Sequence, residues 1–189
     1  MHMTWGHKVR GKKLPLVLTK EEVHSLIEAA ENIRDKMLLI FLYYTGFRVS
    51  EASHCKVQDV SFPANTINVR QGKGHKDRVI AIHPTLKLAL TQWIGYDNTP
   101  EHYLFPGQKT RPLHPRQIYR IVRTTAVRAG ITKRVHPHTL RHSIALHLRR
   151  DGHDLITISR FLGHEDVSTT QIYADSDITD IDKMMSKFR

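Results

Sequence analysis

Cysteine and long apolar stretches are scarce in this chain. Cys55 is the single cysteine among 189 residues, so one chain can form no internal disulfide, which is typical of a reducing compartment such as the cytoplasm. The longest apolar and aromatic run covers residues 37–44, whereas a membrane-spanning helix needs about 20 such residues. The first residues also lack the long apolar segment of a secretory signal peptide. We therefore expect a cytoplasmic protein that does not enter a membrane.

Acidic residues are outnumbered. The chain has 18 Asp and Glu against 29 Lys and Arg, which gives a formal net charge of +11 and a pI near 10.0. The electric field of such a positive net charge attracts polyanions and speeds their association with the protein. Charge alone favours nucleic acid as the partner and leaves a membrane surface or an acidic protein open. It says nothing about chemistry.

Internal repeats and low-complexity segments are absent as well. Hydrophobic residues make up 40% of the sequence, as in folded globular proteins. A chain of this length suits one ordinary domain. Residues 1–17 are interpreted as a basic leader or linker remnant, and residues 18–189 are expected to form the folded domain.

Helical patterns dominate the sequence. Thr19 and Glu22 form a Thr-x-x-Glu capping box, which predicts that the first helix starts at Thr19. Residues 33–45 are apolar on almost every side and are expected to form the central core helix, with Gly46 as its carboxy-terminal cap. Further helices are predicted over residues 49–54, 84–95, a segment ending near 130, 138–150, 155–162, 168–174 and 178–188.

Two short segments change the pattern. Residues 66–69 and 78–82 favour β-strands, and the basic turn Gly72-Lys73-Gly74-His75-Lys76 lies between them. The sequence therefore predicts a β-hairpin. Together with the helices, it indicates a mainly α-helical domain with a small antiparallel β-sheet, an α+β fold.

His138 and Arg141 are three residues apart and share one face of a predicted helix. Two donors side by side can hold two oxygens of one phosphate, and the planar fork of arginine matches phosphate geometry. The alternative is that both side chains are simply solvated on a basic face.

Arg48 follows the end of the predicted core helix, at a turn. A charge rooted beside a core helix needs a partner. The alternative to a catalytic role is a structural ion pair with Glu51 or Asp59.

Three other residues complete the set of candidates, and each also has an ordinary explanation. Lys73 lies in the hairpin turn, where a solvated lysine is common. His164 follows a predicted helix end, where the helix dipole favours a cation. Tyr173 can pack against the core through its ring.

All six residues occur in one order with one set of spacings, and here the sequence resembles the tyrosine recombinases, which include the phage integrases and the Xer-type chromosome-resolving enzymes. The resemblance runs from about Leu16 to the end of the chain. The segments that carry it are Thr-Gly-Phe-Arg48-Val-Ser-Glu, Gly-Lys73-Gly-His-Lys-Asp-Arg, His138-Thr-Leu-Arg141-His-Ser, Leu-Gly-His164 and Thr-Thr-Gln-Ile-Tyr173-Ala.

The resemblance implies a site-specific recombinase or integrase that cleaves and rejoins duplex DNA through a 3′-phosphotyrosyl intermediate. Tyr173 would be the nucleophile. Arg48 and Arg141, with His138 and His164, would stabilise charge on the nonbridging oxygens. Lys73 would act as the general acid that protonates the leaving 5′ oxygen, and His138 would exchange the proton of the tyrosine.

No cofactor or metal is expected. His138 and His142 have the i, i+4 spacing of a helical zinc pair, but Thr139 follows the first histidine where a metalloprotease motif needs Glu. The remaining histidines have no consistent ligand spacing. Two arginines make a metal unnecessary for phosphate chemistry of this kind.

The expected partners are double-stranded DNA and further copies of the chain, as a homo-oligomer, a tetramer, on DNA and as a monomer or weak dimer when free. Family members usually carry an amino-terminal core-binding domain, which is absent from the sequence as given. Two alternatives stay open: a type IB topoisomerase-like DNA-relaxing enzyme, and a non-catalytic DNA-binding regulator.

The segment after Tyr173 is amphipathic. Its apolar residues recur at intervals of three and four and are Ile178, Ile181, Met184, Met185 and Phe188. Such a short helix needs a groove to bury that face. Docking on the same domain and docking on a neighbouring protomer both stay open.

Overall fold

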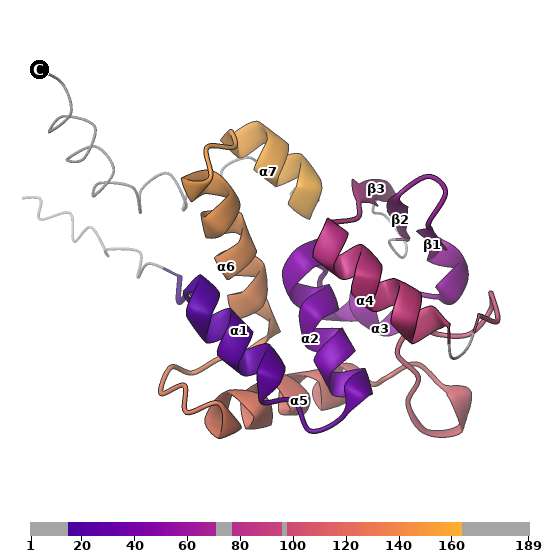
Figure 1. Cartoon of the computed structure of the whole chain (residues 1–189), viewed down its shortest axis with the longest axis horizontal. Coiled ribbons are helices and arrows are strands. Elements are labelled where there is room, and N and C mark those ends of the chain that lie inside the picture. Colours follow the sequence, from indigo (N-terminus) through magenta and orange to yellow (C-terminus); the bar gives the residue numbers. More distant parts are fainter. Residues whose placement is uncertain (1–14, 71–76, 96–97, 164–189) are drawn as a thin grey trace, which may run out of the picture.

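Seven helices and a three-stranded sheet form the part of the chain that the computed structural model describes, residues 15–70, 77–95 and 98–163 (Figure 1). The helices are α1 (Lys20–Glu28), α2 (Ile33–Thr45), α3 (Val49–His54), α4 (Pro84–Ile94), α5 (Pro115–Arg128), α6 (Pro137–Arg150) and α7 (Leu155–Leu162). The strands are β1 (Val60–Ser61), β2 (Thr66–Val69) and β3 (Arg78–Ala81), and two 3-10 turns cover Val57–Asp59 and Gln108–Thr110. The predicted fold class, mainly α with a small antiparallel sheet, is confirmed.

Local sequence signals set the helix ends. The Thr19 hydroxyl accepts from the Glu22 amide and the Glu22 carboxylate accepts from the Thr19 amide, so the predicted capping box is present. At α2 the Asn32 side chain accepts from the Asp35 amide and so caps the helix. Gly46 ends α2 in the left-handed conformation, at φ +59°. The predicted helices over 168–174 and 178–188 lie outside the described residues.

Helix α2 is the centre of the domain. It packs against α1, α4 and α6, and Figure 1 shows these helices around it, with α5 running across one end. Six of its apolar or aromatic residues are buried because the helix has neighbours on most sides. Phe41 shows this best: its ring meets Phe47 at 4.9 Å and Phe105 at 5.2 Å between centroids, both edge to face. The prediction of a buried core helix is confirmed.

The sheet is antiparallel with strand order β1-β2-β3. The predicted hairpin is its β2–β3 pair, in which Ile67 lies opposite Ile80 and Val69 opposite Arg78. The strand β1 was not predicted, because two residues are too few to show an alternating pattern. The loop of the hairpin, residues 71–76, lies outside the described residues.

The end of α7 comes very close to the turn after α2. A Cβ on Gly46 would lie 2.6 Å from Cδ2 of Leu162, so any other residue would force the buried Leu162 side chain to shift. Both its positive φ and this close approach therefore favour glycine at 46. The contact brings the carboxy-terminal ends of α2 and α7 together, and the candidate site is built there.

None of the described helices has the length and apolar character needed to cross a membrane.

Candidate active site

Among the predicted site residues that the structure describes, Arg141 is the most deeply buried, at 4% exposure. It lies on the second turn of α6 and donates to the carbonyl oxygens of Gly46 and Leu162, the latter at 2.7 Å. These carbonyls lie at the ends of α2 and α7, where helix carbonyls have no partner within the helix and the dipole is negative. A buried guanidinium is stabilised by such acceptors. The alternative of a solvated surface arginine is therefore wrong for this residue.

Arg48 lies at the amino-terminal cap of α3, and its side chain is 35% exposed. Its Nη1 donates to Oε1 of Glu51 at 3.0 Å, and its Nη2 donates to the Gly163 carbonyl at 2.9 Å. The expected ion pair with Glu51 is thus present, whereas Asp59 pairs with Arg70 at 2.6 Å. The second contact orients Arg48 toward the end of α7.

The two arginines therefore lie side by side. Arg141 donates to the carbonyl of Leu162 and Arg48 to that of Gly163, two successive residues of the chain. Two guanidinium groups anchored on neighbouring carbonyls concentrate positive charge at one place. Such a pair suits a phosphate, which offers two nonbridging oxygens to two planar forks.

His138 adds an imidazole to this cluster from the first turn of α6. Partial burial, followed by the positive charges of His136, Arg141 and Arg48, lowers the pKa of His138. The ring is therefore neutral near neutral pH and can accept a proton. The same causes, burial first and then His138 and Arg141, lower the pKa of His142 to about 4.

Metal-binding geometry is not found in the described residues. Within residues 15–70, 77–95 and 98–163, no three His, Cys, Asp or Glu side chains are grouped so that they could hold a metal ion.

Comparison with known proteins identifies the family. The sequence model of the phage integrase family matches residues 16–179. The chain belongs to the phage integrase family. This domain is 41% identical over 167 residues to "Tyrosine recombinase XerA" of Pyrococcus horikoshii, a match that covers 86% of this chain and 57% of that protein. The phage integrase domain thus spans less than two thirds of the length of this relative.

Solved structures agree with the family assignment. The phage integrase domain superposes on "Crystal structure of XerA recombinase" with a TM-score of 0.83 and 35% identity, over 95% of this chain and 66% of that one. It also superposes on XerH site-specific recombinase bound to palindromic difH substrate, a post-cleavage complex, with a TM-score of 0.80 and 27% identity, over 96% of this chain and 56% of that one.

Three of the six predicted catalytic residues are thus placed by the structure of this phage integrase domain, and they lie together: Arg48, His138 and Arg141. The other three, Lys73, His164 and Tyr173, lie outside the described residues. The described chain nevertheless ends at Gly163, whose carbonyl Arg48 contacts and which directly precedes His164 in the sequence.

The sequence interpretation missed Arg78, the first residue of β3. Its Nη1 and Nη2 each donate to one oxygen of the Glu51 carboxylate at 3.0 Å, so Glu51 is shared between Arg78 and Arg48. Burial raises the pKa of Glu51, but the hydrogen bond and charge of Arg78, with those of Arg48, lower it below its usual value overall. The sequence did contain a signal for this position. Residues 78 and 80 of one strand share a face, and because Ile80 faces the core, Arg78 is expected to point inward as well.

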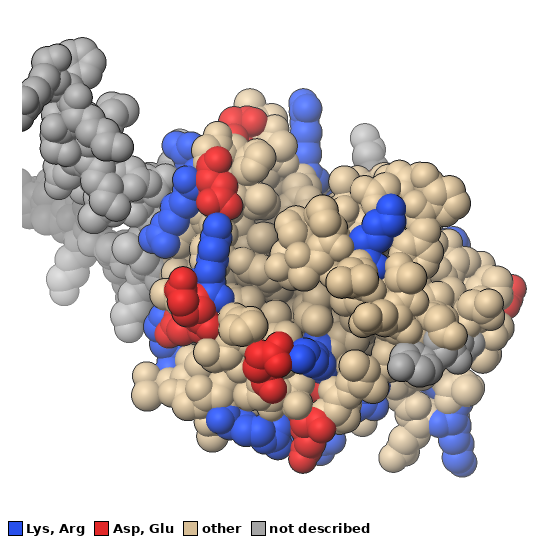
Figure 2. Space-filling view, in the orientation of Figure 1, with Lys and Arg blue, Asp and Glu red and all other residues tan. Residues whose placement is uncertain are grey.

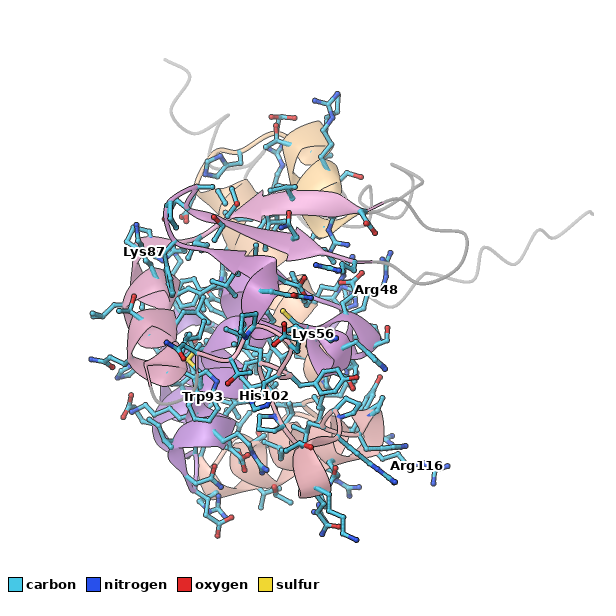
Figure 3. All side chains as sticks on the ribbon, turned by 90° about the vertical axis from the view of Figure 1, so that its right-hand side faces the viewer. Arg48, Lys56, Lys87, Trp93, His102 and Arg116 are labelled. Atoms are coloured by element: carbon cyan, nitrogen blue, oxygen red, sulfur yellow. The ribbon has the colours of Figure 1, made fainter. Side chains whose placement is uncertain are left out.

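Basic and acidic side chains are mixed on the face of the phage integrase domain seen in Figure 2. Arg48 and Arg116 lie instead along one common side of the molecule, seen at the right of Figure 3. Three exposed arginines, Arg120 and Arg123 of α5 and Arg134 of the following loop, line a groove of about 900 Å³ together with Tyr119 and His136. The ring of His136 lies 6.2 Å from that of His138, which joins this groove to the site.

Proposed function

We propose that this chain is the catalytic domain of a site-specific DNA recombinase that cuts and rejoins duplex DNA through a 3′-phosphotyrosyl intermediate. The observation that carries the proposal is the anchoring of Arg48 and Arg141 on successive carbonyls of residues 163 and 162, beside His138. Membership of the phage integrase family and the similarity to proteins named tyrosine recombinases support it.

The chemistry follows from the residue types. In the cleavage step, the Tyr173 hydroxyl oxygen attacks the scissile phosphorus, the P–O5′ bond breaks, and the 5′ oxygen leaves. The tyrosine proton passes to His138, and the leaving oxygen takes a proton from Lys73. The 5′ hydroxyl of a partner strand reverses the step, so the bond energy is kept. The proposed step needs no cofactor to account for its bonds and protons.

The two arginines stabilise the transition state in this scheme. Negative charge develops on the nonbridging oxygens as tyrosine attacks, and fixed donors that need no reorganisation stabilise it most. Arg141 is held by two helix ends and Arg48 by Glu51 and Gly163, so both are fixed before DNA arrives. His164 completes this set as a proposed donor.

The proposed partner is double-stranded DNA. The arginine-lined groove of α5 and the loop at Arg134 supports this, because rows of arginines beside a phosphate site favour a polyanion. We place the enzyme in the cytoplasm because its substrate is DNA. Residues 18–189 would form the catalytic domain and residues 1–17 a leader or linker.

We further propose that the active form is a homo-oligomer, a tetramer, assembled on DNA, with the free protein a monomer or weak dimer. The substrate of the XerH complex is described as palindromic. A palindrome presents two equivalent half-sites, which suits two symmetry-related protomers on each duplex. Joining two duplexes would then require four protomers.

The test is covalent trapping. The full chain would be incubated with a nicked duplex that it has itself selected from a random pool, so that a cleaved end diffuses away and the adduct accumulates. We expect an SDS-resistant protein–DNA adduct from the native chain and none from Tyr173→Phe, which removes only a hydroxyl and should bind DNA with unchanged affinity. An adduct from the phenylalanine variant would show that Tyr173 is not the nucleophile.

A plasmid without the selected site provides a control for function. A recombinase requires its site, whereas a relaxing enzyme of the type IB topoisomerase class acts on any supercoiled plasmid. Efficient relaxation of that plasmid would contradict the proposal.

A further inference from the structure

We infer that Arg78 is a positioning residue of the active site, which neutralises Glu51 and holds the end of α7 so that Arg48 keeps its charge directed at the phosphate. This inference rests on the proposed function, because it assigns a role within the same reaction. Arg78 is not among the six residues that the family resemblance implies for the chemistry.

The place of Arg78 in the fold is unusual for an arginine. It is the first residue of β3, at the base of the hairpin whose turn contains Lys73 in the sequence. Its side chain is only 11% exposed. It lies against the ring of Phe47, with 5.7 Å between the guanidinium carbon and the ring centroid. An arginine placed inward on a strand needs charged partners to offset its desolvation.

Those partners are the carboxylate of Glu51 and the end of α7. Two parallel hydrogen bonds of 3.0 Å join the Arg78 fork to both oxygens of Glu51. The Arg78 Nε donates to the Phe161 carbonyl at 3.3 Å. The two-pronged pair fixes the orientation of the guanidinium as well as its position.

Glu51 is where Arg78 and Arg48 meet. The Glu51 carboxylate, 5% exposed, also accepts from the Arg48 amide at 2.8 Å and from Arg48 Nη1 at 3.0 Å. Two guanidinium charges and one carboxylate charge leave this trio with one net positive charge. Without Arg78, the buried carboxylate would neutralise Arg48 alone, and the site would lose attraction for a phosphate.

The same arginines also hold the end of α7. Arg78, Arg141 and Arg48 donate in turn to the carbonyls of residues 161, 162 and 163. Arg78 also lies flat against Gly163: a Cβ there would come within 2.9 Å of Cδ, Nε and Cζ of Arg78. Three arginines thus fix the three carbonyls that directly precede His164 in the sequence.

A purely structural role for Arg78 makes a different prediction, so the test compares rates with stability. Arg70, which directly follows β2, the other strand of the hairpin, provides a matched control. It pairs with the buried Asp59 at 2.6 Å, yet its own side chain is 62% exposed and it contacts none of the three arginines' acceptors in the described residues. Arg70→Gln removes an arginine's ion pair with a buried carboxylate outside the site.

The experiment uses the full chain and measures the single-turnover rate of adduct formation on the nicked duplex at saturating DNA, together with the DNA Kd and the Tm. We expect Arg78→Gln to slow cleavage by about tenfold to a hundredfold, less than loss of a direct donor. The Kd should change by less than about threefold, because one phosphate contact among many is affected indirectly. Arg70→Gln should cleave at the native rate even where its Tm falls as far.

Arg78→Lys keeps the inference testable if the glutamine variant folds poorly. It retains the charge that balances Glu51 and loses the fork, so it should cleave faster than Arg78→Gln. Equal rates for the two variants, a native rate for Arg78→Gln, or an equal loss in Arg70→Gln would each overturn the inference. If the native chain forms no adduct at all, the proposed function fails as well; if it cleaves and Arg78→Gln cleaves equally fast, only the role of Arg78 is wrong.

Discussion

Arg141 donates a 2.7 Å hydrogen bond to the carbonyl oxygen of Leu162, the last residue of α7. The bond joins the second turn of one helix to the end of the next, across the loop between α6 and α7. Because Arg141 also donates to Gly46, one side chain ties together the ends of α2 and α7. The site that would bind phosphate is therefore also a junction of the fold.

Because Arg141 has this double role, its removal should lower the free energy of unfolding more than removal of Arg48. Arg141→Ala should destabilise the protein by about 2–4 kcal/mol, because it leaves buried carbonyls unpaired. Arg48→Ala should cost about 1 kcal/mol or less, since Arg48 is one-third exposed and Arg78 still pairs with Glu51. Urea unfolding measures both, and equal costs would contradict the structure.

On catalysis the same two variants should behave alike. Each removes one donor to the transition state, which costs about 100-fold to 1,000-fold in rate. Single-turnover cleavage at saturating DNA, at a temperature where both variants are folded, separates this loss from instability. Near-native cleavage by either variant would remove that arginine from the proposed mechanism.

The pH dependence of cleavage reports on His138. Its pKa in the folded protein lies below the ordinary value of 6.5, so the neutral ring that accepts a proton is already dominant at pH 6.5. Protonation of the ring should therefore slow cleavage only at a lower pH than for a histidine with the ordinary pKa. The acid limb should be absent in His138→Gln, at a lower overall rate.

The linked effect on stability has a definite sign. A histidine whose folded pKa is lowered binds its proton more readily in the unfolded chain, so stability falls as pH drops from the unfolded value of 6.5 toward the folded value. His138→Gln should reduce this fall. If the loss of stability at low pH is unchanged in His138→Gln, the proton is bound by another group, such as His142 or His136.

Much of this fold was accessible from the sequence because its signals are local. The helix over residues 33–45 follows from continuous apolar character and a following glycine, and the helix over 49–54 from the turn before it. β1 was missed because its two residues gain their pairing from β2 rather than from their own pattern. Its formation is a tertiary effect.

The candidate site also has features that the sequence could predict and features that it could not. Motif spacing was enough to select Arg48, His138 and Arg141, which the structure brings together. It could not show that Arg141 is buried, since its acceptors are backbone carbonyls that every sequence contains. Nor could it pair Arg78 with Glu51, because the two residues are 27 positions apart and two complete strands, β1 and β2, lie between them. Lys73, His164 and Tyr173 stay predictions.

Gly46 offers a test of the contact between α2 and α7. Gly46 and Gly130 both have positive φ, +59° and +70°, but a Cβ at 46 would meet Leu162 at 2.6 Å whereas one at 130 would meet nothing within 4 Å. Gly130→Ala should therefore cost about 1–2 kcal/mol, from backbone strain alone. Gly46→Ala should cost about 1–3 kcal/mol more, from the clash. Equal costs in urea unfolding would mean that α7 does not approach Gly46 this closely.

The last prediction concerns residues 178–189, which lie outside the described residues. A groove of about 540 Å³ between α1, α2, α6 and α7 provides an apolar surface, formed in part by Val23, Ile27, Leu148, Ile158 and Phe161. The amphipathic pattern of the tail predicts a helix with one apolar face, and such a helix is marginal in water unless that face is buried. We propose that the tail of one protomer fills the groove of its neighbour on DNA.

Deleting residues 178–189 should then impair strand exchange between two sites more than binding to one site, because exchange requires contacts between protomers. The measurement compares the Kd for a single site, the adduct on a nicked duplex, and recombination of paired sites, for the full and shortened chains. Leu148→Glu places a charge in the groove while keeping the tail, and should reproduce the deletion. If the shortened chain recombines paired sites at the native rate, the tail has no part in assembly; if both variants lose single-site binding equally, the groove serves the fold of its own domain.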